Sequence, residues 1–352
     1  MNKTLIRSKC GIWPLILLLM VSLSCTQTPD NNLEEDAAKT EEVEKNQVPT
    51  AQYTLTRQQT HNRFSSTIPP VLKVPSGAVI EAFTEDASDE QFDINSKASA
   101  LDSLSFDPIH PLTGPVYVEG AEVGDVIAVK LHKIEIGDWG WTAVVPGFGF
   151  LADQFTEPYL RTFALGKDGE SVKFNDKISI PLRPFPGVMG VAPATDSMLS
   201  TIPPRANGGN MDDPHMIEGT TVYFPVFVEG ALFSIGDAHA AQGMGEVCGT
   251  GIEAPMRFVY QIDVIKGKPY LKEPQYETDD FYAVTAFATS LDEASKKAVS
   301  YMVDYLVDEH GLERTEAYVL CSLAGDLKVA EVVDVPHVLV SMHMAKTVLG
   351  VE

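Results

Sequence analysis

Short runs of alternating apolar and polar residues follow one another from about Tyr53 to Ile265. In VLKVPSGAVIEAF (71–83), two such runs lie on either side of a Pro-Ser-Gly turn, and VYVEGAEVGDVIAVKLHKI (116–134) repeats the arrangement with breaks that contain glycine. This alternation is typical of strands that bury one face. Many short strands with Gly and Pro between them predict a β-sandwich or barrel rather than a parallel α/β sheet.

The β region contains an internal repeat. VYVEGAEVGDVIAVKL (116–131) and VFVEGALFSIGDAHAAQGMGEV (226–247) share V-[YF]-V-E-G-A followed by Gly-Asp. Such an echo indicates related halves of one β architecture. The first copy continues as an ordinary strand, whereas the second continues with AHAAQGMGE, in which small residues replace apolar core side chains. We therefore interpret Asp125 as a turn residue and the segment after Asp237 as a functional site, because small neighbours permit close approach to the backbone.

The apolar pattern changes to a helical period near the C-terminus. SLDEASKKAVSYMVDYLVDEHG (290–311) begins with Ser290 and Glu293 in a capping-box arrangement and ends at Gly311. Its apolar residues recur three and four positions apart, at Leu291, Ala294, Ala298, Met302 and Leu306. The segment is therefore predicted to be one amphipathic helix.

The rest of the C-terminal part mixes both patterns. ERTEAYVLCSLAG (313–325) predicts a second helix, and LKVAEVVDV (327–335) and HVLVSMHMA (337–345) predict strands. The expected fold class is therefore mainly β with an α+β C-terminal part. We expect a β body over about 53–270 and an α+β subdomain over about 271–352.

The N-terminal residues predict a targeting segment. MNKTLIRSKCG carries basic residues, and the apolar run WPLILLLMVSL, of signal-peptide length, leads to SLSC. This pattern is typical of a bacterial lipoprotein signal over residues 1–24, after which Cys25 becomes the lipidated first residue. An ordinary secretory signal is the alternative. Residues 25–52 are acidic and polar, which predicts a disordered tether before a single domain over 53–352. The protein is thus predicted to be an extracytoplasmic, membrane-anchored lipoprotein, in the periplasm or at the cell surface.

The charge of the chain narrows the classes of partner. Lys and Arg number 26 against 49 Asp and Glu, which gives a formal net charge of −23. Nucleic acid is excluded as a partner because phosphate binding requires a basic surface. A small molecule, a cation or a neutral surface remains, and a homodimer is also considered. Cys248 and Cys321 would form a disulfide only if their Cα atoms come close enough.

Asp237, His239 and Glu246 offer chemistry in the second repeat. Residues two apart in a strand share a face, so Asp237 and His239 project together. An imidazole among carboxylates suits either a divalent metal that activates water or a hydrogen-bonded structural network. GGNMDDPHM (208–216) lies shortly before them and contains Asn210 and further acidic residues. By itself this segment resembles a turn, but both segments are expected to meet at one end of the sandwich.

Other reactive side chains are weaker candidates. Cys248 has no neighbouring Lys or His to lower its pKa, so a nucleophilic role is disfavoured. The aromatic loop GDWGWTAVVPGFGF (137–150) either lines a pocket mouth or fills a core or an interface. His337 and His343 lie in apolar strands and are interpreted as hydrogen-bonded core histidines, whereas the role of His110 is left open.

The longest motifs resemble the acetamidase/formamidase family. The resemblance is carried by GGNMD, PVFVEGALFSIGDAHAAQGMGE, TGPVYVEGAEVGD, PGFGFLADQF and TEAYVLCSLAGDLKV, and it extends over roughly Gln58 to Leu349. It implies hydrolysis of a short-chain amide, such as acetamide or formamide, to carboxylate and ammonia. It also implies a CUB-like or jelly-roll β-sandwich and a metal-assisted site. Two positions depart from the family pattern, where Asn207 replaces a frequent His and Met244 replaces a usual Asp.

Matched by position, the resemblance implies a set of site residues. We expect Asp212, Asp237 and His239 to hold a divalent metal. Zinc is one choice, and calcium is the other because carboxylate oxygens also bind calcium. Glu246 would accept the proton of the attacking water and pass it to the leaving nitrogen, while Asn210 orients the amide. The alternative is a lipid-anchored jelly-roll module that binds a sugar or peptide without catalysis.

Overall fold

The computed structural model describes residues 48–166 and 169–350. The predicted signal peptide, the lipidated Cys25 and tether residues 25–47 lie outside the described residues, so they stay predictions. Within the part that is described, no helix has both the length and the apolar character needed to cross a membrane.

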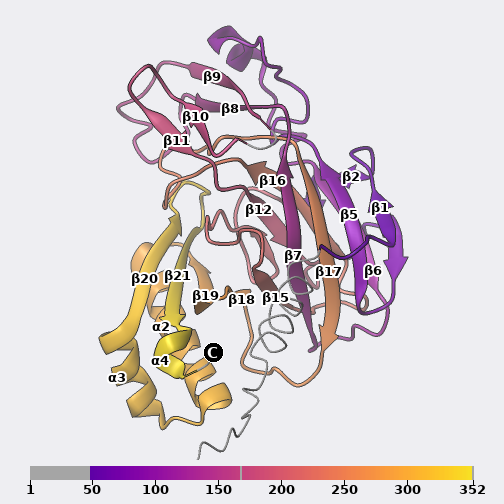
Figure 1. Cartoon of the computed structure of the whole chain (residues 1–352), viewed down its shortest axis with the longest axis vertical. Coiled ribbons are helices and arrows are strands. Elements are labelled where there is room, and N and C mark those ends of the chain that lie inside the picture. The colour runs from indigo at the N-terminus through magenta and orange to yellow at the C-terminus, as the bar shows by residue number, and fades with distance from the viewer. Residues whose placement is uncertain (1–47, 167–168, 351–352) are drawn as a thin grey trace, which may run out of the picture. The chain divides into compact units, whose positions relative to one another are not determined.

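Two large β-sheets contain most of the described strands (Figure 1). The first has nine strands in the spatial order β1 (Tyr53–Leu55), β5 (Ala78–Thr84), β17 (Met256–Ile265), β7 (Val126–Ile136), β15 (Thr221–Pro225), β18 (Gln275–Glu277), β19 (Phe281–Ala288), β21 (Val338–Ala345) and β20 (Gly325–Glu331). The second has six strands, with β4 (Leu72–Val74) paired to β6 beside the order β14 (Gly208–Asn210), β12 (Phe185–Gly190), β16 (Phe233–His239), β6 (Leu112–Val118) and β2 (Thr60–His61).

Smaller elements complete the described chain. Three strand pairs lie outside the large sheets, namely β3 (Arg63–Phe64) with β13 (Leu199–Ser200), β8 (Trp139–Val144) with β9 (Tyr159–Ala164), and β10 (Ser171–Lys173) with β11 (Ser179–Pro181). The helices are the 3-10 helix η1 (Ala98–Ser103) and the α-helices α2 (Leu291–His310), α3 (Arg314–Ala324) and α4 (Lys346–Leu349).

One hydrophobic core joins the two large sheets. Side chains of both sheets belong to it, and Phe233 of β16 meets Tyr260 of β17 edge-to-face with ring centroids 5.6 Å apart. The prediction of a mainly β fold is therefore confirmed. The narrower description as a CUB-like or jelly-roll sandwich is not confirmed, and parallel pairing of β1 with β5 and of β4 with β6 makes both sheets mixed.

The two copies of the internal repeat pack against each other. In each copy the V-E-G-A motif leads the chain from one sheet to the other, from β6 to β7 and from β15 to β16. Backbone bonds join the copies, including Val226 N–H to the Asp125 carbonyl at 2.8 Å. The Asp125 carboxylate accepts from Glu122 N–H at 2.8 Å and from Lys266, which confirms its interpretation as a turn residue.

The C-terminal helices form as predicted. Ser290 accepts a hydrogen bond from Glu293 N–H at the start of α2, and Gly311 ends the helix with a φ of 66°. The buried side of α2 packs on β19 and β21, and α3 follows (Figure 1). Both predicted strands are present, and they extend the nine-stranded sheet.

The strand predicted over 327–335 is wrong at its end. The strand β20 covers Gly325–Glu331, and the chain then leaves the sheet. The cause is the Glu331 side chain, whose Oε2 accepts hydrogen bonds from the N–H groups of Val333 and Asp334 at 2.9 and 3.1 Å. A carboxylate that binds the backbone two and three residues ahead stabilises a turn instead of an extended strand. This turn places Asp334 in the candidate site.

Candidate active site

Strand β12 brings the two predicted segments together. It lies between β14 and β16, with Val188 opposite Asn210 on one side and Phe185 opposite His239 on the other. The residues that follow β14 therefore lie beside the end of β16, which confirms that the two segments meet. The Asp212 Oδ1 atom is 3.6 Å from His239 Nδ1.

Three predicted site residues share an uncommon backbone conformation. Asp212, Asp237 and Glu246 have φ values of 42°, 47° and 46°. A left-handed backbone is unfavourable for residues other than glycine and is concentrated at functional sites, where the surrounding structure holds it in place. The chain thus directs three carboxylates at the cost of local strain.

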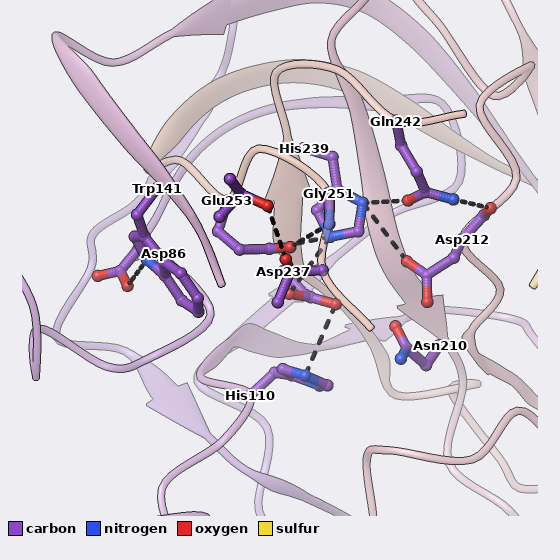
Figure 2. Close-up of polar contacts among 12 residues, drawn as sticks. Asp86, His110, Trp141, Asn210, Asp212, Asp237, His239, Gln242, Gly251 and Glu253 are labelled. Carbon is purple, nitrogen blue, oxygen red and sulfur yellow. Dashed lines mark hydrogen bonds and ion pairs between the residues drawn. The ribbon is translucent and has the colours of Figure 1, made fainter. Parts of the chain in front are cut away.

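His239 lies at the centre of the site (Figure 2). Its Nε2 atom is 2.9 Å from Glu253 Oε2 and 3.7 Å from Asp237 Oδ1, and its ring is 1% exposed. On the far side of Asp237, His110 Nε2 is 3.8 Å from Asp237 Oδ2. The structural arrangement therefore adds Glu253 and His110 to the predicted pair of Asp237 and His239.

Gln242 orients the His239 ring. Gln242 Nε2 donates to the Asp212 carbonyl at 2.8 Å, so its Oε1 faces His239 Nδ1 at 2.6 Å and accepts from it. A neutral imidazole carries one proton, which this hydrogen bond places on Nδ1. In this neutral form the lone pair of Nε2 faces Asp237 and Glu253, and in the protonated form Nε2 carries an N–H in its place.

The carboxylates and histidines shift one another's pKa values. Burial lowers the pKa of His239, but Glu253 and Asp237 outweigh this effect and hold it well above its usual range. Burial raises the pKa of Asp237, but His110 and His239 outweigh burial and lower it to about 2. Burial raises the pKa of Glu253 to about 7. Strong opposed shifts of this kind are typical of functional sites.

A second group of acids lies next to Asn210. Asn210 Nδ2 donates to Asp334 Oδ2 at 2.7 Å. Asn210 Oδ1 and both carboxylate oxygens of Asp212 are buried without a hydrogen-bond partner among the described residues. Burial raises the pKa of Asp212 and of Asp334 well above the usual range, and neighbouring Glu331 raises both further. Buried oxygens without partners are costly unless a ligand or ion satisfies them.

Glu246 lies on a loop held by the end of β20. Gly245 N–H donates to the Ala330 carbonyl at 2.7 Å, and Val332 N–H donates back to the Gly245 carbonyl at 3.2 Å. Burial and the nearby Asp212 raise the pKa of Glu246 well above its usual range. Glu246 is 6% exposed, more than Asp212 or Glu253, and it lines the pocket.

The site opens into a small pocket with a volume of about 50 Å³. A single water needs roughly 10–15 Å³, so the pocket has room for a small ligand in place of water. Its polar lining consists of His110, Asn210, Asp237, His239, Glu246, Thr250, Glu253 and Asp334. Trp141 and Phe148 of the predicted aromatic loop also line it. The prediction of a loop is wrong over Trp139–Val144, which form β8, and Trp141 belongs to a small hydrophobic core as well as to the pocket wall.

The remaining reactive groups lie outside this pocket. Cys248 is exposed and Cys321 is buried, and both are free thiols. His343 is bonded to Tyr276 and to Ser341, as expected for a core histidine. It neighbours Asp213 and His215 in a hydrogen-bonded group behind the site.

Comparison with known proteins identifies the class. The sequence matches the Acetamidase/Formamidase family over residues 47–200 and 194–350. It is 28% identical over 269 residues to the acetamidase of Mycolicibacterium smegmatis, which covers 59% of this chain and 66% of that protein. It is also 28% identical over 302 residues to the formamidase of Methylophilus methylotrophus, which covers 68% of this chain and 74% of that protein.

Solved structures agree with the sequence comparison. A predicted acetamidase/formamidase of Thermoanaerobacter tengcongensis has a TM-score of 0.80 and 35% identity, over 85% of this chain and 97% of that one. The acetamidase of Bacillus halodurans has a TM-score of 0.80 and 32% identity, over 84% and 98%. The fold and the site therefore define an amidohydrolase that acts on short amides. The chain belongs to the acetamidase/formamidase family.

Proposed function

We propose that this chain hydrolyses short-chain linear amides, similar to acetamide or formamide, to carboxylate and ammonia with the help of a divalent metal. The observation that carries the proposal is the placement of buried His239 among Asp212, Asp237 and Glu253, in the lining of a small pocket. The relatives named acetamidase and formamidase support the substrate class. They give no support to the alternative of a sugar- or peptide-binding module.

The donor atoms fit a divalent cation. Three groups among the described residues could hold an ion, and two of them share His239: Asp212, His239 and Glu246, and Asp237, His239 and Glu253. Among the described residues that line the pocket there is no Lys or Arg to balance these carboxylates. Nitrogen with oxygen donors suits zinc, while oxygen donors alone suit calcium. The carboxylates favour a proton on His239. A bound cation would displace this proton and supply the positive charge in its place.

The hydrogen bond from Nδ1 to Gln242 leaves Nε2 of His239 as the atom that would hold the metal. Asp237 and Glu253 lie on that side of the ring, and Asp212 lies on the other. We therefore propose Asp237, His239 and Glu253 as the metal ligands. Asp212 would be a ligand only in the alternative group with His239 and Glu246. When bound, such a metal polarises a carbonyl and lowers the pKa of water.

The remaining residues position the amide and move protons. Glu246 accepts the proton of the attacking water and delivers it to the departing nitrogen, because an amine leaves readily only when protonated. Asn210 has a free carbonyl oxygen that can accept the N–H of the substrate amide, while its NH₂ group is fixed by Asp334. Trp141, bonded through Nε1 to Asp86 at 2.8 Å, forms a rigid wall that excludes water.

Removal of the metal tests the proposal directly. Purified protein should release ammonia from formamide, acetamide or propionamide, lose this activity after chelation and regain it with one divalent metal. Elemental analysis before and after chelation identifies the ion, zinc or calcium. The Asp237→Ala variant should lose metal and activity together, because Asp237 is the only proposed ligand whose pKa stays below its usual range.

Chelator-resistant turnover by metal-free protein would refute the metal and leave amide hydrolysis standing. Failure on every amide, together with a sugar or peptide that raises the melting temperature, would instead favour the binding module.

We further propose that the protein is a lipid-anchored lipoprotein outside the cytoplasm, on the basis of the apolar run and Cys25 at the N-terminus. A Cys25→Ser variant should move from the membrane fraction to the soluble fraction, because lipid attachment requires the thiol. Fractionation and the mass of the N-terminal peptide measure this. A variant that stays in the membrane fraction would contradict the anchor. The mass of the solubilised protein in solution tests the predicted homodimer.

A further inference from the structure

The pocket is lined by both polar and apolar side chains. Figure 2 shows Asp237, Glu253, His110 and Asn210 around His239, and all five line the pocket. Its remaining wall is mostly apolar and includes Leu104, Phe106, Ile109, Val145, Phe148 and Ile202. An amide group bound beside His239 would therefore have apolar side chains within the same pocket for its acyl chain, and these favour alkyl groups over hydrogen or charge.

Two phenylalanines from distant segments meet in this apolar wall. Phe106 lies between η1 and β6, and Phe148 follows β8 in the chain. Their ring centroids are 6.4 Å apart with planes at 64°, an edge-to-face contact. Both rings line the pocket, so the pair forms part of its apolar wall.

Phe148 is held at a fixed place by the loop that carries Glu246. A Cβ atom at Gly249 would lie 2.5 Å from Phe148 Cε1, so the ring rests directly on the Gly249 backbone. Gly249 N–H in turn donates to the Glu246 carbonyl at 2.7 Å. The Phe148 ring and Glu246 are thus supported by the same segment of backbone.

We propose that Phe106 and Phe148 set the length of the acyl chain that the enzyme accepts. This inference rests on the proposed amide hydrolysis and deepens it. The apolar wall stabilises a methyl or ethyl group, whereas the aromatic pair excludes longer chains from the pocket of about 50 Å³. The preferred substrates are therefore amides with a small alkyl group, ahead of formamide.

A chain-length series measures this selectivity. Wild-type kcat/KM should rise from formamide to acetamide or propionamide and fall by about 10-fold or more at hexanamide, because one methylene in an apolar pocket changes selectivity by roughly 10–200-fold. Phe148→Ala should raise the ratio of hexanamide to acetamide kcat/KM at least ~10-fold. Phe106→Ala, whose ring is 44% exposed, should shift the ratio in the same direction without threatening the fold.

Phe150→Ala is the matched control. Phe150 is in the same loop as Phe148 and 58% exposed, and it does not line the pocket, so its removal should leave the ratio unchanged. An unchanged ratio in both Phe106→Ala and Phe148→Ala, with acetamide turnover intact, would overturn the inference but not the proposed function. If Phe148→Ala fails to fold, the ratio in Phe106→Ala decides. A wild-type protein that hydrolyses none of the amides would overturn both.

Discussion

A Glu246→Gln variant should retain its divalent metal yet hydrolyse amides ~10²–10⁴-fold more slowly than the wild type, the usual range for the loss of a general acid–base. Glutamine keeps the size of the side chain and removes its basicity. Glu246 faces the pocket, and burial with the nearby Asp212 raises its pKa, so it can take a proton from water and return it to nitrogen. Ammonia release gives kcat, and elemental analysis of the same sample gives the metal content.

The internal repeat supplies a control for this experiment. Asp125→Ala changes the Gly-Asp position of the first copy, which caps a turn far from the pocket lining. It should leave turnover per folded molecule nearly intact. Equal losses in Glu246→Gln and Asp125→Ala would mean that stability, and not proton transfer, was affected. Loss of the metal from Glu246→Gln would make Glu246 a ligand in the group with Asp212 and His239.

Comparison of the two repeat copies was the most informative sequence observation. Both copies begin alike, so the loss of core side chains after Asp237 indicates a function there. The ordinary strand after Asp125 indicates that Asp125 is a turn residue. The structure brings Asp237 and His239 next to Asp212, because β14 and β16 flank the same strand, β12. Local sequence cannot show this pairing. The two segments are only about twenty residues apart in the chain, which predicts that they meet.

Other members of the site were hidden because their neighbours in sequence give no sign of them. Glu253 pairs through its backbone with both His239 and Trp141 as an isolated bridge, outside any regular strand. Asp334 stood inside an apparently continuous strand that ends early at the Glu331 turn. The available signal is acids within mostly apolar stretches, namely Glu253 in GIEAPM and both Glu331 and Asp334 in LKVAEVVDV. The sequence around His110 assigns it no role, since only the fold brings it to Asp237.

A Gly187→Ala variant should lose about 100-fold or more in kcat/KM, since a displacement of about 1 Å near the chemistry can cost that much. Gly187 lies in β12, and a Cβ atom there would be 2.7 Å from the Asp237 carbonyl, 3.0 Å from His239 Cε1 and still closer to Asp212 Oδ1. The backbone cannot move aside, because the Gly187 carbonyl accepts from Met211 N–H and Asp212 N–H at 2.9 and 3.2 Å. The added methyl group must therefore push the proposed ligands apart.

The same variant should also show weaker metal binding and a lower melting temperature, because overpacking a buried position costs about 1–3 kcal/mol. Gly243→Ala is the matched control. Gly243 belongs to the exposed part of the loop between Gln242 and Glu246, and a Cβ atom there would meet nothing within 4 Å. Its activity, metal content and melting temperature should stay at wild-type values. If Gly187→Ala kept full activity and metal, Asp212, Asp237 and His239 would not need their close spacing, and the site built around them would have to be given up.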